Sequence, residues 1–300
     1  MPEPLFILCP PRSYSSIVCG MLGQHPQCYG LPELNLFLAD TIGEIWYGST
    51  FFRSSGFHGI CRTLAQLHSG EQTEEAVILA KEWITARPSW PVRRLFDHIQ
   101  ELVGDRILID KSPSTLFRRD HLERLLRVYP NANILHLIRH PRGMGESLIT
   151  LRKTDKSLKF FDQLVTDAQR LDPERMWRNS HEMAVALTDP LPLGQCMRVK
   201  GELMMSQLDV FLPQLCEWLG IRSDAEAIAA MMHPEDSPYA RLGPANAPGG
   251  NDPNFLQDPK VDMARLARLK EPSLVGELSW RTGDGFRPKT IRLAKQLGYA

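Results

Sequence analysis

The sequence predicts a three-layer, P-loop-like α/β fold, in which a central, mainly parallel sheet is flanked by helices. Short apolar runs of strand length alternate with longer segments of helical spacing. Several runs end in polar loops, as the strands of ligand-binding parallel sheets do. With 300 residues, of which 43% are hydrophobic and 23% charged, the chain is large enough to bury the core of one large domain.

The first apolar run, Leu5–Cys9, predicts a buried strand, and helical spacing resumes at Ile17. The loop between them, PPRSYSS, carries the polar side chains of Arg12, Ser13, Ser15 and Ser16. A helix N-terminus offers free N–H groups and the positive end of a dipole, so hydroxyls and a guanidinium beside it predict a phosphate site. Alternatively, Ser15 only caps the helix and Arg12 is solvated.

A single acid, Glu33, lies in the apolar stretch CYGLPELNLF at 28–37. A carboxylate in such surroundings is a candidate general base, and the alternative is a surface acid in a loop.

Residues 39–105 are read as a helical insertion, in which Glu74–Thr85 has the spacing of an amphipathic helix. We expect this insertion to shape an acceptor pocket, or to serve packing alone.

Two further strands end in candidate site residues. Arg106–Ile109 leads to Lys111, and loops at one edge of a parallel sheet are where such folds bind ligands. Ile134–Ile138 leads to Arg139, and Ser147 follows eight residues later in the next helix. Arg139 and Ser147 together predict a second phosphate site.

The remaining chain continues the alternation of strands and helices. A further strand is expected at Cys196–Val199. Helical spacing is found at Gly143–Leu151, Phe160–Leu187, Leu208–Leu219, Val261–Lys270 and Lys289–Leu297. Residues 233–259 are rich in proline and glycine but include the apolar pair Phe255 and Leu256. A loop of this length is usually functional or disordered, and the apolar pair favours a lid.

Composition argues against several function classes. Lys plus Arg equals Asp plus Glu at 35 each, so no global field draws the chain to nucleic acid or to a membrane. No apolar run is long enough to span a bilayer and no export signal is present, so we expect a cytoplasmic protein. Six cysteines without a C-x-x-C pair predict buried free thiols. No metal motif is found, and His136 and His140 are expected to be a hydrogen-bonded core histidine and a histidine that lies behind the site, rather than a metal-binding pair.

Arginines recur in the segment 116–128, at Arg118, Arg119, Arg124 and Arg127. They are consistent with docking of an acidic carrier protein, although a solvated helix face is the favoured interpretation. The sequence predicts no particular oligomeric state.

Two motifs together resemble a known family. PPRSYSS before a helix, and IRHPRGMGES with Arg139 and Ser147 eight residues apart, resemble the cofactor motifs of sulfotransferases that use 3′-phosphoadenosine 5′-phosphosulfate (PAPS). PELNLF at 32–37, ILIDKSPS at 107–114 and NDPNFLQD at 251–258 are similar to stretches of the sulfotransferase domains in olefin synthases and curacin-type polyketide synthases. The resemblance covers most of the chain and implies one sulfotransferase domain over residues 1–300.

The resemblance also implies roles for individual residues. The first loop, comprising Arg12, Ser13, Tyr14, Ser15 and Ser16, would bind the phosphosulfate, and Arg139 and Ser147 would bind the ribose phosphate. The implied catalytic residues are Glu33 as base, Lys111 on the sulfuryl group, and Arg12. A histidine base is absent because Pro113 stands two residues after the lysine. Tyr14 replaces a usual glycine, and a positive φ there would cost tyrosine about 1–2 kcal/mol.

The expected reaction transfers a sulfuryl group from PAPS to an acceptor hydroxyl and leaves adenosine 3′,5′-bisphosphate. The acceptor would be a β-hydroxyacyl group on a carrier protein or a small natural-product alcohol, and no metal is required. A P-loop kinase is one alternative, although G-x-x-x-x-G-K-[ST] is missing. A non-catalytic nucleotide-binding protein is the other, because of Tyr14.

Overall fold

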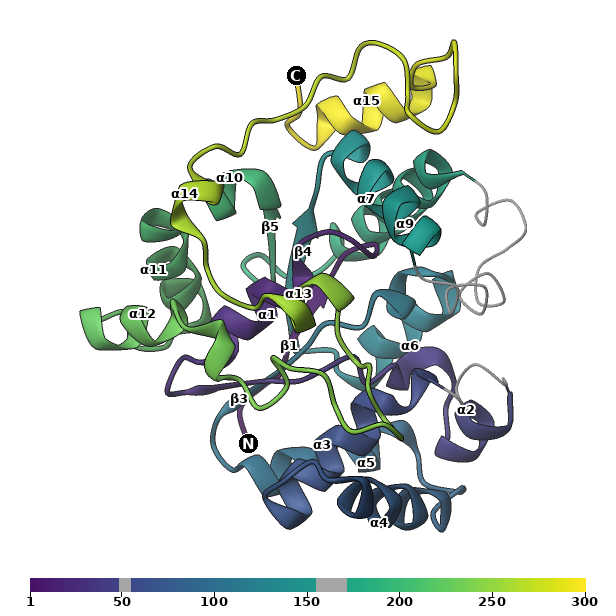
Figure 1. The fold of residues 1–300 in the computed structure, drawn as a ribbon, viewed down its shortest axis with the longest axis vertical. Coiled ribbons are helices and arrows are strands. Elements are labelled where there is room, and N and C mark those ends of the chain that lie inside the picture. The colour runs from purple at the N-terminus through teal and green to yellow at the C-terminus, as the bar shows by residue number, and fades with distance from the viewer. Residues whose placement is uncertain (49–54, 155–171) are drawn as a thin grey trace.

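A parallel five-stranded sheet lies at the centre of the computed structural model, which describes residues 1–48, 55–154 and 172–300 (Figure 1). The strand order is β2-β3-β1-β4-β5, and every neighbouring pair is parallel. The strands are β1 Leu5–Leu8, β2 Cys28–Gly30, β3 Ile107–Asp110, β4 Asn133–Ile138 and β5 Cys196–Lys200. The α/β fold class and its parallel sheet are therefore confirmed.

Four of these strands were expected from the sequence, and β2 was not. β2 has only three residues, including a glycine, so it carries too short an apolar pattern to indicate a strand. It forms because Cys28, Tyr29 and Gly30 pair with residues 107–109 of β3, a tertiary contact that local sequence does not encode.

Helices connect and cover the strands. They are α1 Ser15–Gly23, η1 Leu36–Leu38, α2 Ile42–Gly48, α3 His58–Ser69, α4 Glu74–Thr85, α5 Val92–Val103, η3 Pro113–Leu116, α6 Arg119–Val128, α7 Pro141–Thr154, α9 Pro173–Thr188, α10 Gly201–Ser206, α11 Leu208–Leu219, α12 Ala225–Met231, η5 Pro234–Asp236, α13 Pro253–Gln257, α14 Met263–Leu266 and α15 Pro288–Gln296. The helices expected at Glu74–Thr85 and Leu208–Leu219 have these bounds, and the second ends at Gly220, which has φ 67.

Two expected helices differ from the structure. Val261–Lys270 contains only the single turn α14, which buries Leu266, although Val261 and Leu269 on either side of it also pack against the core. Phe160–Leu187 corresponds to α9 from Pro173 onward, and residues 160–171 lie outside the described residues. The described part of the 39–105 insertion is helical, as expected, in α2, α3, α4 and α5.

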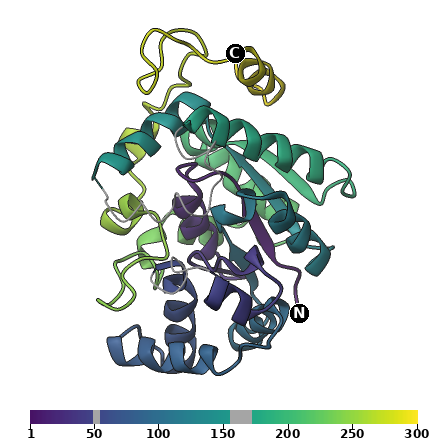
Figure 2. The same cartoon turned by 90° about the vertical axis from the view of Figure 1, so that its right-hand side faces the viewer.

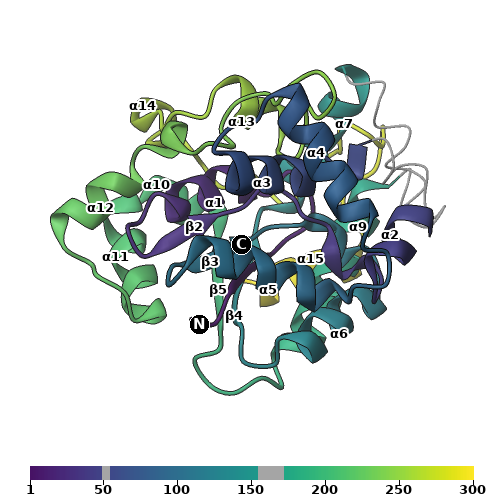
Figure 3. The ribbon, with the colours of Figure 1, turned by 90° about the horizontal axis from the view of Figure 1, so that it is seen from below.

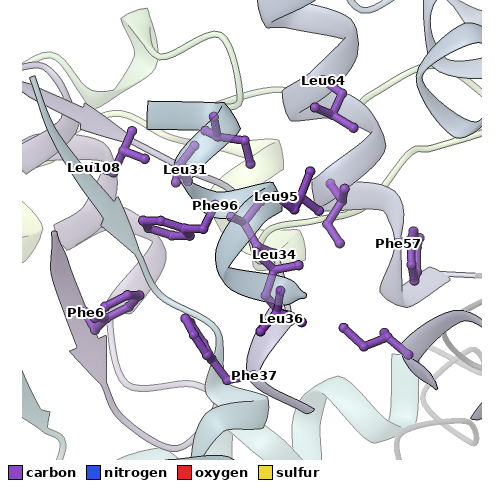
Figure 4. Packing of buried hydrophobic residues seen from close by; sticks show 14 of the residues in the cluster. Phe6, Leu31, Leu34, Leu36, Phe37, Phe57, Leu64, Leu95, Phe96 and Leu108 are labelled. Carbon is purple, nitrogen blue, oxygen red and sulfur yellow. The ribbon is translucent and has the colours of Figure 1, made fainter. Parts of the chain in front are cut away.

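Alternating side chains of the strands pack on the two faces of the sheet. Phe6 and Leu8 of β1 belong to a core shared with α3, α5 and α6, whereas Leu5 and Ile7 belong to a core shared with α1, α11 and α12. Figure 3 shows the strands lying between these two groups of helices. On the first face, Phe6 meets Phe37 edge to face, with ring centroids 5.3 Å apart (Figure 4). The sheet is thus buried on both sides, as parallel sheets require.

The insertion and the C-terminal helix lie at opposite ends of the molecule. Figures 1 and 2 show α3, α4 and α5 at one end and α15 at the other. Between them, α13 of the 233–259 loop lies beside α1, and Phe255 is close enough to Gly20 that a Cβ there would approach its ring to 3.0 Å. This loop therefore covers the helix that follows the first candidate phosphate loop.

Packing of α1 on β2 requires a glycine at the end of the helix. A Cβ at Gly23 would lie 2.6 Å from the backbone nitrogen of Gly30, whereas a Cβ at Gly48, the last residue of α2, would meet none of the described residues within 4 Å. We expect Gly23→Ala to lower the free energy of unfolding by about 1–3 kcal/mol, because the backbone must move to admit a methyl group. The matched variant Gly48→Ala should stay within about 0.5 kcal/mol of the wild type in denaturant titrations. Equal effects of the two substitutions would contradict this packing.

Candidate active site

The loop after β1 enters helix α1 in a strained conformation. Arg12 and Tyr14 both have φ 67, and Tyr14 is the N-terminal flanking residue of α1, with no side-chain cap on the helix. The side chain of Ser13 is fully buried, and its hydroxyl has no hydrogen-bond partner. A buried, unpaired hydroxyl at a helix N-terminus costs free energy unless a ligand satisfies it. The loop therefore holds a hydrogen-bonding group that no residue of the protein satisfies.

A buried ion pair lies behind this loop. Lys111 follows β3 and is fully buried, and its Nζ donates to the hydroxyl of Ser16 at 2.8 Å and to Oε1 of Glu33 at 2.9 Å. The Glu33 side chain is 27% exposed, so one end of the pair is open to solvent. A lysine, a hydroxyl and a carboxylate from three segments thus meet at one point.

Three segments fix the backbone on either side of Glu33. The Glu33 N–H donates to the carbonyl of Gly250 at 2.7 Å, and the Asn35 N–H donates to the hydroxyl of Ser112 at 2.9 Å. A Cβ at Gly59 of α3 would lie 2.0 Å from the Glu33 carbonyl oxygen, so the insertion packs directly on this backbone. The position of the Glu33 carboxylate therefore depends on the 233–259 loop, the loop after β3 and the insertion.

The loop after β4 reaches back to the first loop. Arg139 donates from Nη1 to the carbonyl of Arg12 at 2.6 Å, and Arg12 donates from Nε to the hydroxyl of Ser147 on α7 at 3.0 Å. The indole of the buried Trp177 donates to the Arg139 carbonyl at 2.7 Å, which fixes the end of β4. The Nε of Arg139 is buried without a partner, so it is free to donate to a ligand.

One cavity of about 390 Å³ joins the two loops. It is lined by residues of α1 and its preceding loop, the loop after β4, α7, α10 and the segment 252–269, among them Arg12, Tyr14, Ser16, Arg139, Ser147, Met205, Asp252, Phe255, Lys260, Arg265 and Leu266. Of the predicted residues, Ser13, Ser15, Glu33 and Lys111 are not part of this lining. Glu33 and Lys111 are joined to it through Ser16, which lines the cavity and accepts from Lys111.

Sequence reasoning missed five charged residues of this cavity, the acids Asp252, Asp258 and Asp262 and the bases Lys260 and Arg265. Asp252 forms an ion pair with Arg12, and its N–H donates to the Ser16 hydroxyl at 3.2 Å. Lys260 and Arg265 add positive charge to the lining. The segment NDPNFLQD was noted only for its resemblance to other sequences, although an aspartate before proline is a frequent start of a helix, and Asp252 indeed caps α13.

Asp110 is a further buried acid next to the Lys111 site, and the sequence analysis did not single it out. Its Oδ1 accepts from the Leu34 N–H at 3.3 Å and from the Ser112 hydroxyl at 3.0 Å. Burial raises the pKa of Asp110 to about 6, and the hydrogen bonds of its carboxylate oppose that shift. Asp110 thus ties the segment that carries Glu33 to the loop that carries Lys111.

The other sequence hypotheses fall outside the site. All six cysteines are free thiols, as predicted, and only Cys196 is half-buried rather than buried. His136 and His140 are core residues, and His136 hydrogen-bonds to His181 at 2.8 Å. Within the described ranges, no group of three or more metal-ligating side chains occurs, and no helix has the length and apolar character needed to cross a bilayer.

Each arginine of the 116–128 segment forms an ion pair with an aspartate or glutamate of this protein. The pairs are Arg118 with Asp120, Arg119 with Glu123, and Arg124 and Arg127 with Asp40. This arrangement favours the solvated helix face over a carrier-protein surface.

The raised pKa of Asp110 predicts a pH dependence of stability. Below about pH 4 the carboxyl is protonated in both the folded and the unfolded state, and above its folded pKa it is ionised in both. Between these values the folded state holds the proton more tightly than the unfolded state does. The contribution of Asp110 to the free energy of unfolding therefore falls as pH rises. We expect the free energy of unfolding of the wild type, minus that of Asp110→Asn, to fall by about 2–3 kcal/mol from pH 4 to pH 7 and then level off. A difference that is constant or rises over this range would contradict the assignment.

Comparisons with known proteins agree with this geometry. The sequence model of the sulfotransferase family matches residues 4–225. The sulfotransferase domain of the Synechococcus PCC 7002 olefin synthase is 26% identical, with a TM-score of 0.76, and the alignment covers 100% of this chain and 97% of that one. The sulfotransferase domain from the curacin biosynthetic pathway is 23% identical, with a TM-score of 0.78, and the alignment covers 100% of this chain and 99% of that one. This second domain shares the fold. No curated protein matches the sequence.

The matched region includes both polar loops, the Glu33–Lys111 pair and all five strands of the sheet described above. The chain therefore belongs to the sulfotransferase family, and it is a transferase of that type.

Proposed function

We propose that this protein transfers a sulfuryl group from PAPS to the hydroxyl of an acceptor. The observation that carries the proposal is that the loops of Arg12 and Arg139, 127 residues apart in sequence, line a single cavity. A doubly phosphorylated nucleoside needs two anion-binding sites at a fixed separation, and separate surface sites would not serve it.

The residues of the cavity fit this cofactor. Two buried donors lack partners: the Nε of Arg139, a residue of the cavity lining, and the hydroxyl of Ser13, which belongs to the first loop but lies outside that lining. Arg12, Ser13, Ser15, Ser16 and the N-terminus of α1 would hold the phosphosulfate, and Arg139 and Ser147 the phosphate on the ribose. Tyr14 would line the cofactor cavity between them. When bound, PAPS supplies an activated sulfuryl group, and the anion would compete with the Asp252 carboxylate for Arg12.

In the Glu33–Lys111 pair, Glu33 would accept the proton of the acceptor hydroxyl, and Lys111 would stabilise the negative charge on the sulfuryl group. Oε1 of Glu33 accepts a hydrogen bond from Lys111, which orients the partly exposed carboxylate. Oε2 is then available to take the proton of an acceptor hydroxyl. The Nζ of Lys111, next to Ser16 of the phosphate loop, would neutralise charge that develops on the sulfuryl oxygens. Sulfuryl transfer is an in-line displacement like phosphoryl transfer, so positioning and cationic stabilisation supply most of the rate enhancement.

The relatives support a class of acceptor. Similarity over the full chain to an olefin synthase domain supports a β-hydroxyacyl group on an acyl carrier protein, and a small hydroxylated natural product is the second candidate. A panel of both kinds of acceptor, assayed with PAPS for sulfated product by mass spectrometry, tests the function directly. Sulfation of neither kind by the folded protein would refute the proposal.

Ligand-induced stabilisation distinguishes this proposal from a kinase or an unrelated nucleotide-binding protein. We expect adenosine 3′,5′-bisphosphate at 100 times its dissociation constant to stabilise the fold by about 2.7 kcal/mol, which is a rise of several degrees in melting temperature. Mg-ATP at the same concentration should have a much smaller effect, because it lacks the 3′-phosphate. Stabilisation by Mg-ATP alone would indicate a kinase instead.

Substitutions at the two groups of residues should affect different kinetic parameters. We expect Glu33→Gln and Lys111→Met to lower kcat by about 10²–10⁴-fold with little change in KM for PAPS, because both act on the transferring groups. Arg139→Ala should chiefly raise KM for PAPS, by about 10–100-fold, through loss of a charged hydrogen bond.

Steady-state kinetics with varied PAPS measures both effects, and circular dichroism confirms that each variant folds. Arg119→Ala, on the solvated face of α6, serves as the matched control for loss of an arginine. An unchanged kcat in both Glu33→Gln and Lys111→Met would show that these residues do not take part in transfer.

A further inference from the structure

The backbone of Tyr14 is strained, and no hydrogen bond from its own side chain to helix α1 compensates for that strain. Its φ of 67 and ψ of 4 lie in the left-handed region, which tyrosine adopts at a cost and glycine does not. The side chain makes no capping hydrogen bond to α1. Backbone strain at a site is retained where the surrounding structure gains something from it, so the ring of Tyr14 requires an explanation.

The ring of Tyr14 lies against the guanidinium of Arg139. The guanidinium carbon is 4.5 Å from the ring centroid, which is within the range of a cation–π interaction. Burial raises the pKa of the Tyr14 phenol and the nearby Arg139 opposes that shift, so the phenol stays protonated at neutral pH while its ring faces the guanidinium.

A glycine makes room for this ring. A Cβ at Gly201, the first residue of α10, would lie 2.7 Å from Cδ2 of Tyr14 and 3.2 Å from the carbonyl oxygen of Ile138. The ring therefore fits only because residue 201 has no side chain. Strain at position 14 and a glycine at position 201 act together to place one aromatic ring beside Arg139.

The other sides of the Arg139 guanidinium are also enclosed. Its Nη1 donates to the carbonyl of Arg12, and a Cβ at Gly143 of α7 would lie 3.2 Å from its Nε. The Nε itself is buried without a partner. The guanidinium is thus fixed between the first loop, α7 and the ring of Tyr14, and its Nε–H is left without an acceptor in the protein.

We propose that Tyr14 is a positioning residue, whose ring holds the guanidinium of Arg139 in the orientation that binds the 3′-phosphate of the nucleotide, in a space provided by Gly201. This inference rests on the proposed function and deepens it. It assigns Tyr14 an effect on one phosphate of the cofactor only. The first loop therefore contributes to recognition of both ends of the nucleotide.

The test compares two nucleotides that differ only in the 3′-phosphate. Dissociation constants of adenosine 3′,5′-bisphosphate and adenosine 5′-monophosphate are measured by calorimetry for the wild type, Tyr14→Gly, Tyr14→Phe and Gly201→Ala. The glycine variant adopts the left-handed conformation without cost, so the loop backbone can persist when the ring is removed. Tyr14→Phe keeps the ring and removes only the hydroxyl.

We expect Tyr14→Gly to weaken binding of the bisphosphate by about 3–30-fold and to leave binding of the monophosphate within about twofold of the wild type. Gly201→Ala should act in the same direction by displacing the ring, and Tyr14→Phe should keep the wild-type ratio of the two constants. In an Arg139→Ala background, Tyr14→Gly should have no further effect on that ratio.

Equal weakening of both nucleotides by Tyr14→Gly, or an unchanged ratio, would overturn the inference and leave the proposed function intact. The same holds if Tyr14→Gly changes the ratio as strongly in the Arg139→Ala background. If the wild type binds neither nucleotide, the proposed function itself fails.

Discussion

Parallel pairing of β1 with β4 is the constraint on which the site depends. Residues 5–8 pair in register with residues 133–136, so the carboxyl ends of two neighbouring strands meet at the same edge of the sheet. The loops that follow are then close enough for Arg139 to donate to the carbonyl of Arg12 at 2.6 Å. Without this pairing, two loops more than a hundred residues apart in sequence could not line one cavity.

The fold stabilises a site that is locally unfavourable. Among the described residues, the non-glycine residues with positive φ are Arg12, Tyr14 and Asn35, and all three lie in or beside the site. Lys111 and Asp110 are buried ionisable groups in the same region. Strain and buried charge persist because the strands beneath them pack on both faces into apolar cores. The stability of the two cores is therefore what allows the site to exist.

The sequence predicted the parts of this arrangement that are local. Apolar runs located β1, β3, β4 and β5, and the polar residues at their ends identified the two loops because strand-end loops have a recognisable chemistry. Lys111 was found for the same reason, and its contact with Glu33 follows from the close approach of 33–35 to the loop after β3.

The parts that could not be predicted depend on tertiary contacts. β2 is too short to have a pattern and forms only by pairing with β3. Asp252, Lys260 and Arg265 enter the cavity because the 252–269 segment folds across α1, and nothing in their local sequence indicates that path. Sequence reasoning recognised the possible strain at Tyr14, but the partner of its ring, Arg139, is distant in sequence and became apparent only in the fold.

A crystal structure of the protein with adenosine 3′,5′-bisphosphate tests the central claim most directly. The account predicts one nucleotide in the cavity of about 390 Å³, with its 5′-phosphate within hydrogen-bond distance of Arg12 and Ser16 and its 3′-phosphate on Arg139 and Ser147. A nucleotide bound elsewhere, or one that contacts a single loop, would contradict it.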